Sequence, residues 1–246
     1  MILIYNKGSD NMIEYEMNEG KEVKITVDNK TYLRKAIKTH FVKQGESYLD
    51  IMEKYVLPNY REGDFISVSE KIIALCQNRV VKREDIKIGF WAKFLSKFAS
   101  HPDTGVGVGE TIKMQYAINK VGLLKVLWAA FASAITKLFG KKGVFYEIVG
   151  QEVSGLDGFY DHVWSEYRDI GIEMPSNPSG VCNEIKDKLG ISCMIVDAND
   201  LGQEILGFSD DLKEKENILK EFIKDNPAGQ GNECTPIILM HEEKGI

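Results

Sequence analysis

Cysteine and histidine are scarce in the sequence, and neither is spaced like a set of metal ligands. The chain has four of each; no two cysteines lie two or three residues apart, and no histidine stands in an HxxxH or HExxH pattern. These absences argue against a zinc ribbon and against a histidine-based zinc hydrolase. Ser154 lies outside any GxSxG elbow, so an α/β-hydrolase has little support either.

Long apolar runs are missing as well. The one run that raises a membrane question, 126–136, falls far short of the ~20 residues that a spanning helix needs, so we expect a buried or half-buried helix there. The first residues lack the basic start and the small-residue cleavage site of a signal peptide. We therefore expect a cytoplasmic protein with reduced cysteines and no spanning segment.

The composition is that of an ordinary globular protein. Among 246 residues there are 22 glycines and 6 prolines, too few for a fibrous or disordered chain. The length suits one large domain or two modest ones. With 31 basic and 37 acidic side chains the net charge is −6, which argues against a general affinity for nucleic acid because phosphates would be repelled.

Strand and helix signals are mixed without strict alternation, which predicts an α+β (mixed α/β) fold. Residues 22–27 and 31–33 form a predicted β-hairpin around the turn Asp28-Asn29, and we place it in an N-terminal extension, 1–38, before a main domain, 39–246. The pattern predicts helices at 48–55, 86–98, 114–118, 126–136, 179–189 and 212–223, and strands at 65–68, 144–149, 192–196 and 235–240.

Two acidic turns are candidate metal sites. The strand at 192–196 delivers Asp197 at its end, followed by Ala-Asn-Asp, and such carboxylate and amide oxygens are ligands for hard cations. The same residue types favour polar turns, so a turn that caps the strand is the alternative. A second turn, 155–158, contains Asp157. If Asp157 and Asp197 converge, they can hold a magnesium or manganese ion that also binds phosphate oxygens.

Two glycine-rich loops could bind a ligand through their backbone. In the loop 228–236, two glycines allow close approach, and Gln230 and Glu233 add oxygen donors for a metal or a nucleotide. A flexible glycine turn is the alternative. The GxGxG run 105–109 lacks the lysine and the hydroxyl of a phosphate-binding P-loop, so a structural turn is the simpler interpretation there.

Four segments carry a resemblance to a known family. In chain order they are Glu62-Gly63-Asp64-Phe65-Ile66-Ser67-Val68-Ser69-Glu70-Lys71-Ile72, Gly155-Leu156-Asp157, Ile195-Val196-Asp197-Ala198-Asn199 and Gly229-Gln230-Gly231-Asn232-Glu233-Cys234-Thr235-Pro236. Together they resemble the F420-0:gamma-glutamyl ligase family, which adds glutamate to a deazaflavin coenzyme precursor using GTP and a divalent metal. The resemblance covers most of the chain after about Thr39, and the middle portion is similar to a divergent bacterial branch of ligase-like proteins.

The resemblance implies a ligase-like fold of mixed sheets with helices packed on them, and a homodimer. It implies that GTP and Mg²⁺ or Mn²⁺ convert a carboxylate acceptor into an acyl phosphate, which glutamate or another amino acid then attacks to form an amide. The implied metal ligands are Asp157, Asp197 and Gln230, with the two aspartates as catalytic residues. The implied nucleotide-binding residues are Thr39, His40, Glu70, Lys71, Gly229, Gln230, Gly231, Asn232 and Glu233.

Three departures from the family pattern bear on activity. Phe159-Tyr160 replaces the Ser-Asn that follows the first metal aspartate, Ala198 replaces a threonine, and Leu75 stands where a nucleotide-contacting lysine is expected. A non-catalytic nucleotide- or metal-binding or regulatory module of the same fold is therefore the alternative to an enzyme. A third hypothesis is association with a membrane surface or a partner through 123–139, which carries three aromatic residues.

Overall fold

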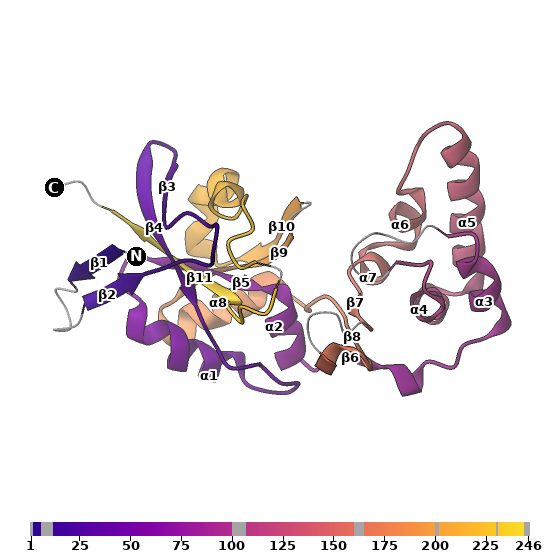
Figure 1. Cartoon of the computed structure of the whole chain (residues 1–246), viewed down its shortest axis with the longest axis horizontal. Coiled ribbons are helices and arrows are strands. Elements are labelled where there is room, and N and C mark those ends of the chain that lie inside the picture. Colours follow the sequence, from indigo (N-terminus) through magenta and orange to yellow (C-terminus); the bar gives the residue numbers. More distant parts are fainter. Residues whose placement is uncertain are drawn as a thin grey trace. The chain divides into compact units, whose positions relative to one another are not determined.

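The computed structural model describes residues 2–5, 12–99, 107–159, 165–199, 202–229 and 231–243 (Figure 1). The chain forms two compact units. We call Met1–Asn78 with Pro175–Ile246 the sheet unit, and Arg79–Met174 the helical unit. The division that we predicted at residues 38 and 39 is a different one, since it falls inside the sheet unit.

A six-stranded mixed sheet forms the centre of the sheet unit, in the order β10-β9-β5-β11-β4-β3. Of its pairs, β5 and β9 run parallel and the others antiparallel. A separate pair, β1 with β2, lies near the N-terminus. The strands are β1 (Ile2–Tyr5), β2 (Met12–Tyr15), β3 (Lys24–Val27), β4 (Lys30–Ile37), β5 (Phe65–Ser69), β9 (Ser192–Asn199), β10 (Gly202–Phe208) and β11 (Ile237–Glu242).

The predicted N-terminal hairpin is confirmed. Strands β3 and β4 pair around a two-residue turn in which Asp28 and Asn29 have φ values of 50° and 60°. Two positive φ values in a two-residue loop match the twist of the flanking strands, and Asp and Asn tolerate that conformation better than most residues. The hairpin belongs to the main sheet, because β4 also pairs with β11.

Helices cover both faces of this sheet (Figure 1). One face packs against α1 (Tyr48–Ile51), α2 (Glu70–Cys76) and α8 (Pro178–Leu189), and the other against a 3-10 helix, η5 (Asp210–Phe222). Along β11, Ile237 and Leu239 enter the first core while Ile238 and Met240 enter the second. This period of two leaves the central strands apolar on both sides, as expected for a sheet that is covered twice.

The helical unit combines a helix cluster with a three-stranded sheet in the order β6-β8-β7. Helix α4 packs against α3 and α5, and α5 against α6. The elements are β6 (Val80–Lys82), α3 (Phe90–Ser96), α4 (Thr111–Val121), α5 (Leu123–Leu138), α6 (Val144–Val149), α7 (Gln151–Ser154), β7 (Asp157–Gly158) and β8 (Ile170–Ile172).

The predictions for this unit were less accurate than those for the sheet unit. The predicted strand 144–149 is wrong, because α6 occupies it between Gly143 and Gly150, which have φ values of 85° and 96°. Helix α3 starts at Phe90 rather than at residue 86. Helix α5 exists as predicted, but only Val126 and Ala129 are buried on it. No helix within the described ranges is long and apolar enough to cross a membrane.

Candidate functional site

One edge of the six-stranded sheet collects four of the segments singled out from the sequence. The register pairs Ile237 at the start of β11 with Ile37 near the end of β4 and with Val68 near the end of β5. Parallel pairing places Ser69 at the end of β5 beside Val196 on β9. The carboxyl ends of β4, β5 and β9 therefore share an edge with the amino end of β11. Thr39-His40, Glu70-Lys71 and the loop 229–236 follow or precede these strand ends, and Asp197 lies on β9 one residue beyond Val196.

Backbone hydrogen bonds tie these segments together. The Thr39 N–H donates to the Cys234 carbonyl at 3.0 Å, and the Ser69 N–H donates to the Pro236 carbonyl at 2.9 Å. Thr39 and Glu70 are buried, with 6% and 8% of their surface exposed. Lys71 is half-buried and His40 is exposed. The edge thus offers a cation, a buried carboxylate and an exposed imidazole within adjacent segments.

The described residues of the loop 229–236 include two with restrained backbone conformations. Gly229 has a φ of 77°, and a Cβ placed on it would lie 2.9 Å from Oε1 of Glu233. The Glu233 carboxylate thus folds back over Gly229, a position where a side chain would clash. Cys234 has a φ of 59°, a strained value for a residue other than glycine. Gly231 and Asn232 are exposed, and Gln230 lies outside the described residues.

Asn18 anchors this loop, a contact that the sequence analysis missed. Its Nδ2 donates to Oγ1 of Thr235 at 2.8 Å and to the Pro227 carbonyl at 2.9 Å. Oγ1 of Thr235 in turn donates to the Ala228 carbonyl at 3.2 Å. A residue that lies more than 200 positions earlier in the chain therefore fixes both ends of the glycine-rich loop. No local motif around Asn18 indicates this role.

Asp197 lies within a β-ribbon instead of at a strand end. Strand β9 continues to Asn199 and pairs with β10, so the predicted end of the strand at 196 is wrong. The register places Glu204 directly opposite Asp197. Directly opposed residues of an antiparallel pair project to the same face, which brings two carboxylates close together. Sequence reasoning did not find Glu204 because β10 was not predicted.

Asp157 belongs to the helical unit, whereas Asp197 belongs to the sheet unit. Their convergence on one metal ion stays a prediction. Asp157 lies on β7, where its Oδ1 accepts a hydrogen bond from the Gly158 N–H at 2.8 Å. Within the described ranges, no group of three or more His, Cys, Asp or Glu side chains could hold a metal ion. Any metal at Asp197 would therefore need ligands from elsewhere, such as nucleotide phosphates and water.

A buried lysine lies near Asp157. Lys113 on α4 is 4% exposed, and its Nζ donates to the carbonyls of Ser154 at 3.2 Å and Leu156 at 2.8 Å. Burial lowers the pKa of Lys113 to about 8, against the opposing effect of the negative charge of Asp157. This lysine is not among the residues predicted from the sequence, because nothing in the sequence around it marks burial.

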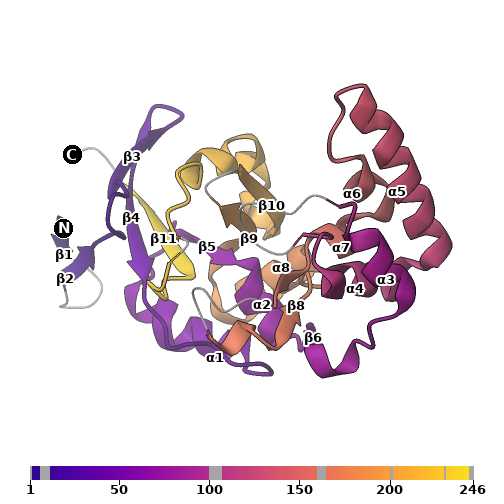
Figure 2. The ribbon, with the colours of Figure 1, turned by 45° about the vertical axis from the view of Figure 1, so that its right-hand side comes forward.

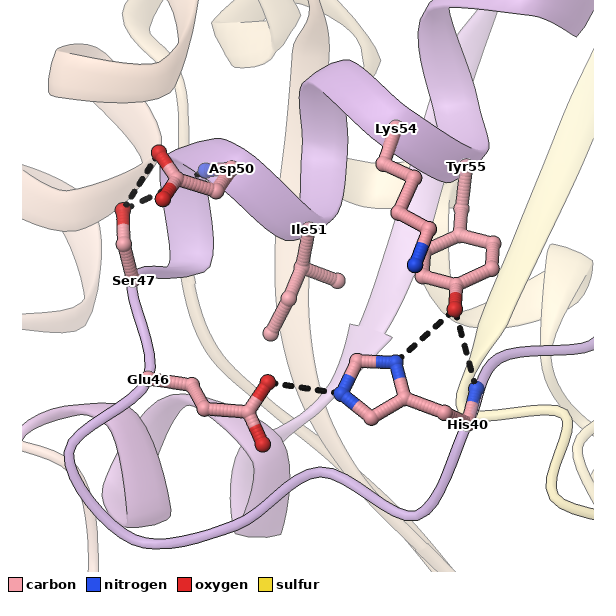
Figure 3. Close-up of a pocket in the computed structure, with 7 residues that line it drawn as sticks. All are labelled: His40, Glu46, Ser47, Asp50, Ile51, Lys54 and Tyr55. Carbon is pink, nitrogen blue, oxygen red and sulfur yellow. Dashed lines mark hydrogen bonds and ion pairs between the residues drawn. The ribbon is translucent and has the colours of Figure 1, made fainter.

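A pocket of about 380 Å³ opens beside Thr39, between the segment 40–47 and the first helical turns after it (Figure 3). Nδ1 of His40 lies 2.8 Å from the Tyr55 hydroxyl, and Nε2 of His40 lies 2.6 Å from Oε2 of Glu46. The His40 backbone N–H also donates to the Tyr55 hydroxyl at 3.3 Å. The pocket is lined by His40, Glu46, Ser47, Asp50, Ile51, Lys54 and Tyr55.

These contacts orient the imidazole of His40. The Tyr55 hydroxyl oxygen accepts a hydrogen bond from the His40 backbone N–H, so the hydroxyl proton is available to Nδ1 of His40. In a neutral imidazole the ring proton then lies on Nε2, where it is directed at Glu46. The other oxygen of Glu46 accepts from the Lys43 N–H at 2.7 Å. Burial alone would raise the pKa of Glu46, but the hydrogen bonds from Lys43 and His40 lower it below its usual value. The imidazole is thus held between the Tyr55 hydroxyl and the carboxylate of Glu46.

Comparison with known protein families finds none that matches the chain. No curated protein matches it either.

Proposed function

We propose that the protein is a metal- and nucleotide-dependent amide ligase related to the F420-0:gamma-glutamyl ligases. The observation that carries the proposal is the shared edge of the six-stranded sheet, where the ends of β4, β5, β9 and β11 bring Thr39-His40, Glu70-Lys71, Asp197 and the loop 229–236 together. The sequence pointed to these segments separately, and their register supports one common site. We propose a homodimer on the resemblance alone.

The donor set suits a magnesium or manganese ion that is shared with a nucleotide. Such ions usually take one or two protein carboxylates and complete their shell with phosphate oxygens and water. Asp197 and the opposed Glu204 provide two carboxylates on one face of the ribbon. Gln230 and Asp157 are the further ligands that the resemblance implies. When bound, the ion would neutralise phosphate charge during phosphoryl transfer.

In the proposed reaction, an oxygen of the acceptor carboxylate attacks the γ-phosphorus of GTP, and the bond to the β-phosphate oxygen breaks to release GDP. The amine of the amino acid then attacks the acyl carbon, phosphate leaves, and the amine loses a proton as the amide forms. Lys71 supplies positive charge near the phosphates, and the backbone of the loop 229–236 supplies N–H donors. No nucleophilic side chain is needed.

The pocket at His40 provides a base for the second step. An attacking amine must be neutral, and its proton can pass to the Tyr55 hydroxyl as that hydroxyl gives its own proton to Nδ1 of His40, whose Nε2–H is directed at Glu46. Lys54 lies in the same pocket, with its Nζ 4.9 Å from the centre of the Tyr55 ring. Its positive charge suits the carboxylate of an incoming amino acid. We propose that the amino acid binds here, next to the nucleotide edge.

Calorimetry with manganese and GTP tests the site. The unchanged protein is expected to bind the pair, and Asp197→Asn is expected to weaken binding at least about a hundredfold, because one carboxylate of the metal site is lost. Asp187→Asn is the matched control, since Asp187 is an exposed residue on α8 of the same unit. Equal binding by both variants, or no binding by the unchanged protein, would contradict the proposal.

A non-catalytic module is the second candidate, and one observation favours it. Leu75 stands where the family has a nucleotide-contacting lysine, and its side chain is 2% exposed in the core of the sheet unit. It therefore offers nothing to a nucleotide. Release of phosphate from GTP, measured with a mixture of carboxylic acids and with glutamate, separates the candidates. A module would bind manganese and GTP without releasing phosphate.

A further inference from the structure

The helical unit exposes aromatic and aliphatic side chains that the proposed ligase reaction does not use. Twelve large hydrophobic side chains are exposed among the described residues, and eleven of them lie between Ile88 and Phe139. Leu57 is the exception. Scattered exposed apolar residues are normal, but a concentration within two helices and their ends marks an interaction surface.

Helix α5 presents its share of these side chains as a single stripe. Leu124, Trp128, Phe131, Ile135 and Leu138 follow one another at intervals of four and three residues, which places them on one side of the helix. Leu124 and Leu138 are 83% and 85% exposed. The buried residues of the helix lie on the opposite side and pack on the core of the unit. The side chains of the stripe therefore do not contribute to the core of the helical unit.

Helix α3 and the turn after it add a cluster of aromatic rings. Phe94 lies 6.1 Å from Phe90, 6.2 Å from Trp91 and 5.2 Å from Phe98 between ring centroids. All four rings are exposed, Phe90 and Phe98 by more than 70%. Figures 1 and 2 both show α3 and α5 farther from the three-stranded sheet of this unit than α4. We call the exposed residues of α3 and α5 the aromatic face.

The charge around the aromatic face is opposite to that of the chain. Residues 86–142 contain nine lysines and two acidic residues, and without the buried Lys113 their net charge is +6 within a chain of −6. Lys93 and Lys97 are exposed at α3, and Lys125 and Lys137 are exposed on α5. No Asp or Glu occurs within either helix. Aromatic rings interspersed with lysines are typical of helices that lie in the headgroup region of a membrane.

We propose that the aromatic face binds an anionic lipid surface, with α5 lying in the plane of the membrane. A helix of 16 residues is about 24 Å long and suits this orientation, in which its apolar stripe enters the acyl boundary and its lysines reach the headgroups. A second copy of the chain fits less well, because two faces of this charge would repel each other. A nucleic acid would neutralise the lysines but leave the aliphatic stripe in water.

Flotation of the full-length protein with vesicles tests the proposal. We expect binding to vesicles of phosphatidylcholine with 30 mol% phosphatidylglycerol, weaker binding at high salt, and little binding to pure phosphatidylcholine. Trp91 and Trp128 lie on the face, so bound protein should show a blue shift of tryptophan fluorescence. The double variant Trp128→Ser/Phe131→Ser is expected to weaken binding at least about tenfold, and Lys125→Glu/Lys137→Glu by a similar factor.

Leu57→Ser is the matched control, because Leu57 is an exposed hydrophobic residue of the sheet unit. It should leave vesicle binding unchanged. Light scattering of the same samples tests whether a second copy of the chain covers the aromatic face instead. The proposal would be overturned by a protein that is a dimer, becomes a monomer in Trp128→Ser/Phe131→Ser, and does not bind anionic vesicles. Equal binding by the double variant and the control would overturn it too. None of these measurements depends on nucleotide, so they are independent of the ligase proposal.

Discussion

The two units use the same residue types in opposite ways. In the sheet unit, Tyr32 and Phe65 pack edge to face against Phe222, with ring centroids 4.7 and 4.9 Å from that of Phe222, and all three are at most 1% exposed. In the helical unit, Phe94 makes edge-to-face contacts with Trp91 and Phe98 while 43% of it is exposed. Ring contacts alone therefore do not identify a core. The buried fraction of the rings distinguishes a contact that stabilises the fold from one on an exposed surface.

Replacement of a phenylalanine by alanine should therefore change the free energy of unfolding very differently in the two units. Phe222→Ala removes a fully buried ring and should lower the free energy of unfolding of the sheet unit by about 4 kcal/mol. Phe131→Ala, on the exposed stripe of α5, should change that of the helical unit by less than about 0.5 kcal/mol. Urea denaturation followed by circular dichroism measures both. Comparable losses would mean that the aromatic face is part of a core.

Vesicle binding should show the reverse order. Phe131→Ala is expected to weaken it, whereas Phe222→Ala should not, provided that it is measured at a temperature where the variant stays folded. If Phe222→Ala lost vesicle binding as well as stability, the aromatic face would depend on the fold of the sheet unit.

The second prediction concerns a buried charge in the helical unit. The pKa of Lys113 is about 8 in the folded chain against 10.5 in the unfolded one, so between these values the unfolded chain binds more protons. Stability contributed by this group is complete above pH 10.5 and lost as the pH falls through 8. We expect the helical unit to gain about 3 kcal/mol over that range from Lys113 alone. Lys113→Met should abolish the gain.

Denaturation at pH 7.5, 8.5 and 9.5 checks this prediction, below the range where the tyrosines ionise. Lys97→Met is the matched control, because Lys97 is exposed. A pH slope that persists in Lys113→Met would assign it to another group. In the sheet unit the buried cation is Arg34, whose guanidinium lies 2.6 Å from Asp225. Burial raises the pKa of the Cys76 thiol in that unit to about 12, so the sheet unit should instead lose stability as the pH rises through the pKa of an unfolded thiol.

The sheet unit was easier to predict from the sequence than the helical unit, for a physical reason. Its strands at 65–68 and 235–240 and its helix at 179–189 are short apolar or amphipathic runs bounded by turn residues, and the structure has strands or a helix at each. The run Val-Phe-Tyr-Glu-Ile-Val at 144–149 has the same composition as a strand. It is helical because glycines bound it and its buried side chains pack on α4 and α5. Periodicity cannot separate these cases.

The candidate site shows a similar division between local and distant information. Asp197 and the glycine-rich loop could be recognised because each adjoins a predicted strand, whereas Lys71 was named only through the family resemblance. Glu204, Asn18 and Tyr55 could not, since their roles depend on strand register or on contacts across the fold. Whether the segments meet at one edge was equally beyond the sequence. That conclusion needed the pairing of β11 with both β4 and β5.

The smallest expected effect concerns backbone strain, which also differs between the units. Cys234 in the sheet unit and Phe159 in the helical unit have φ values of 59° and 60°. The Phe159 ring is buried, so a glycine there would lose packing. Cys234→Gly should relieve about 1 kcal/mol of backbone strain in the folded chain. The greater conformational freedom of glycine in the unfolded chain offsets most of this, so the free energy of unfolding should rise by less than about 1 kcal/mol. Thermal denaturation should show a small rise in Tm. Cys234→Ala removes the thiol but keeps the strain and should show no rise, so an equal gain from alanine would assign the effect to the thiol and not to the backbone.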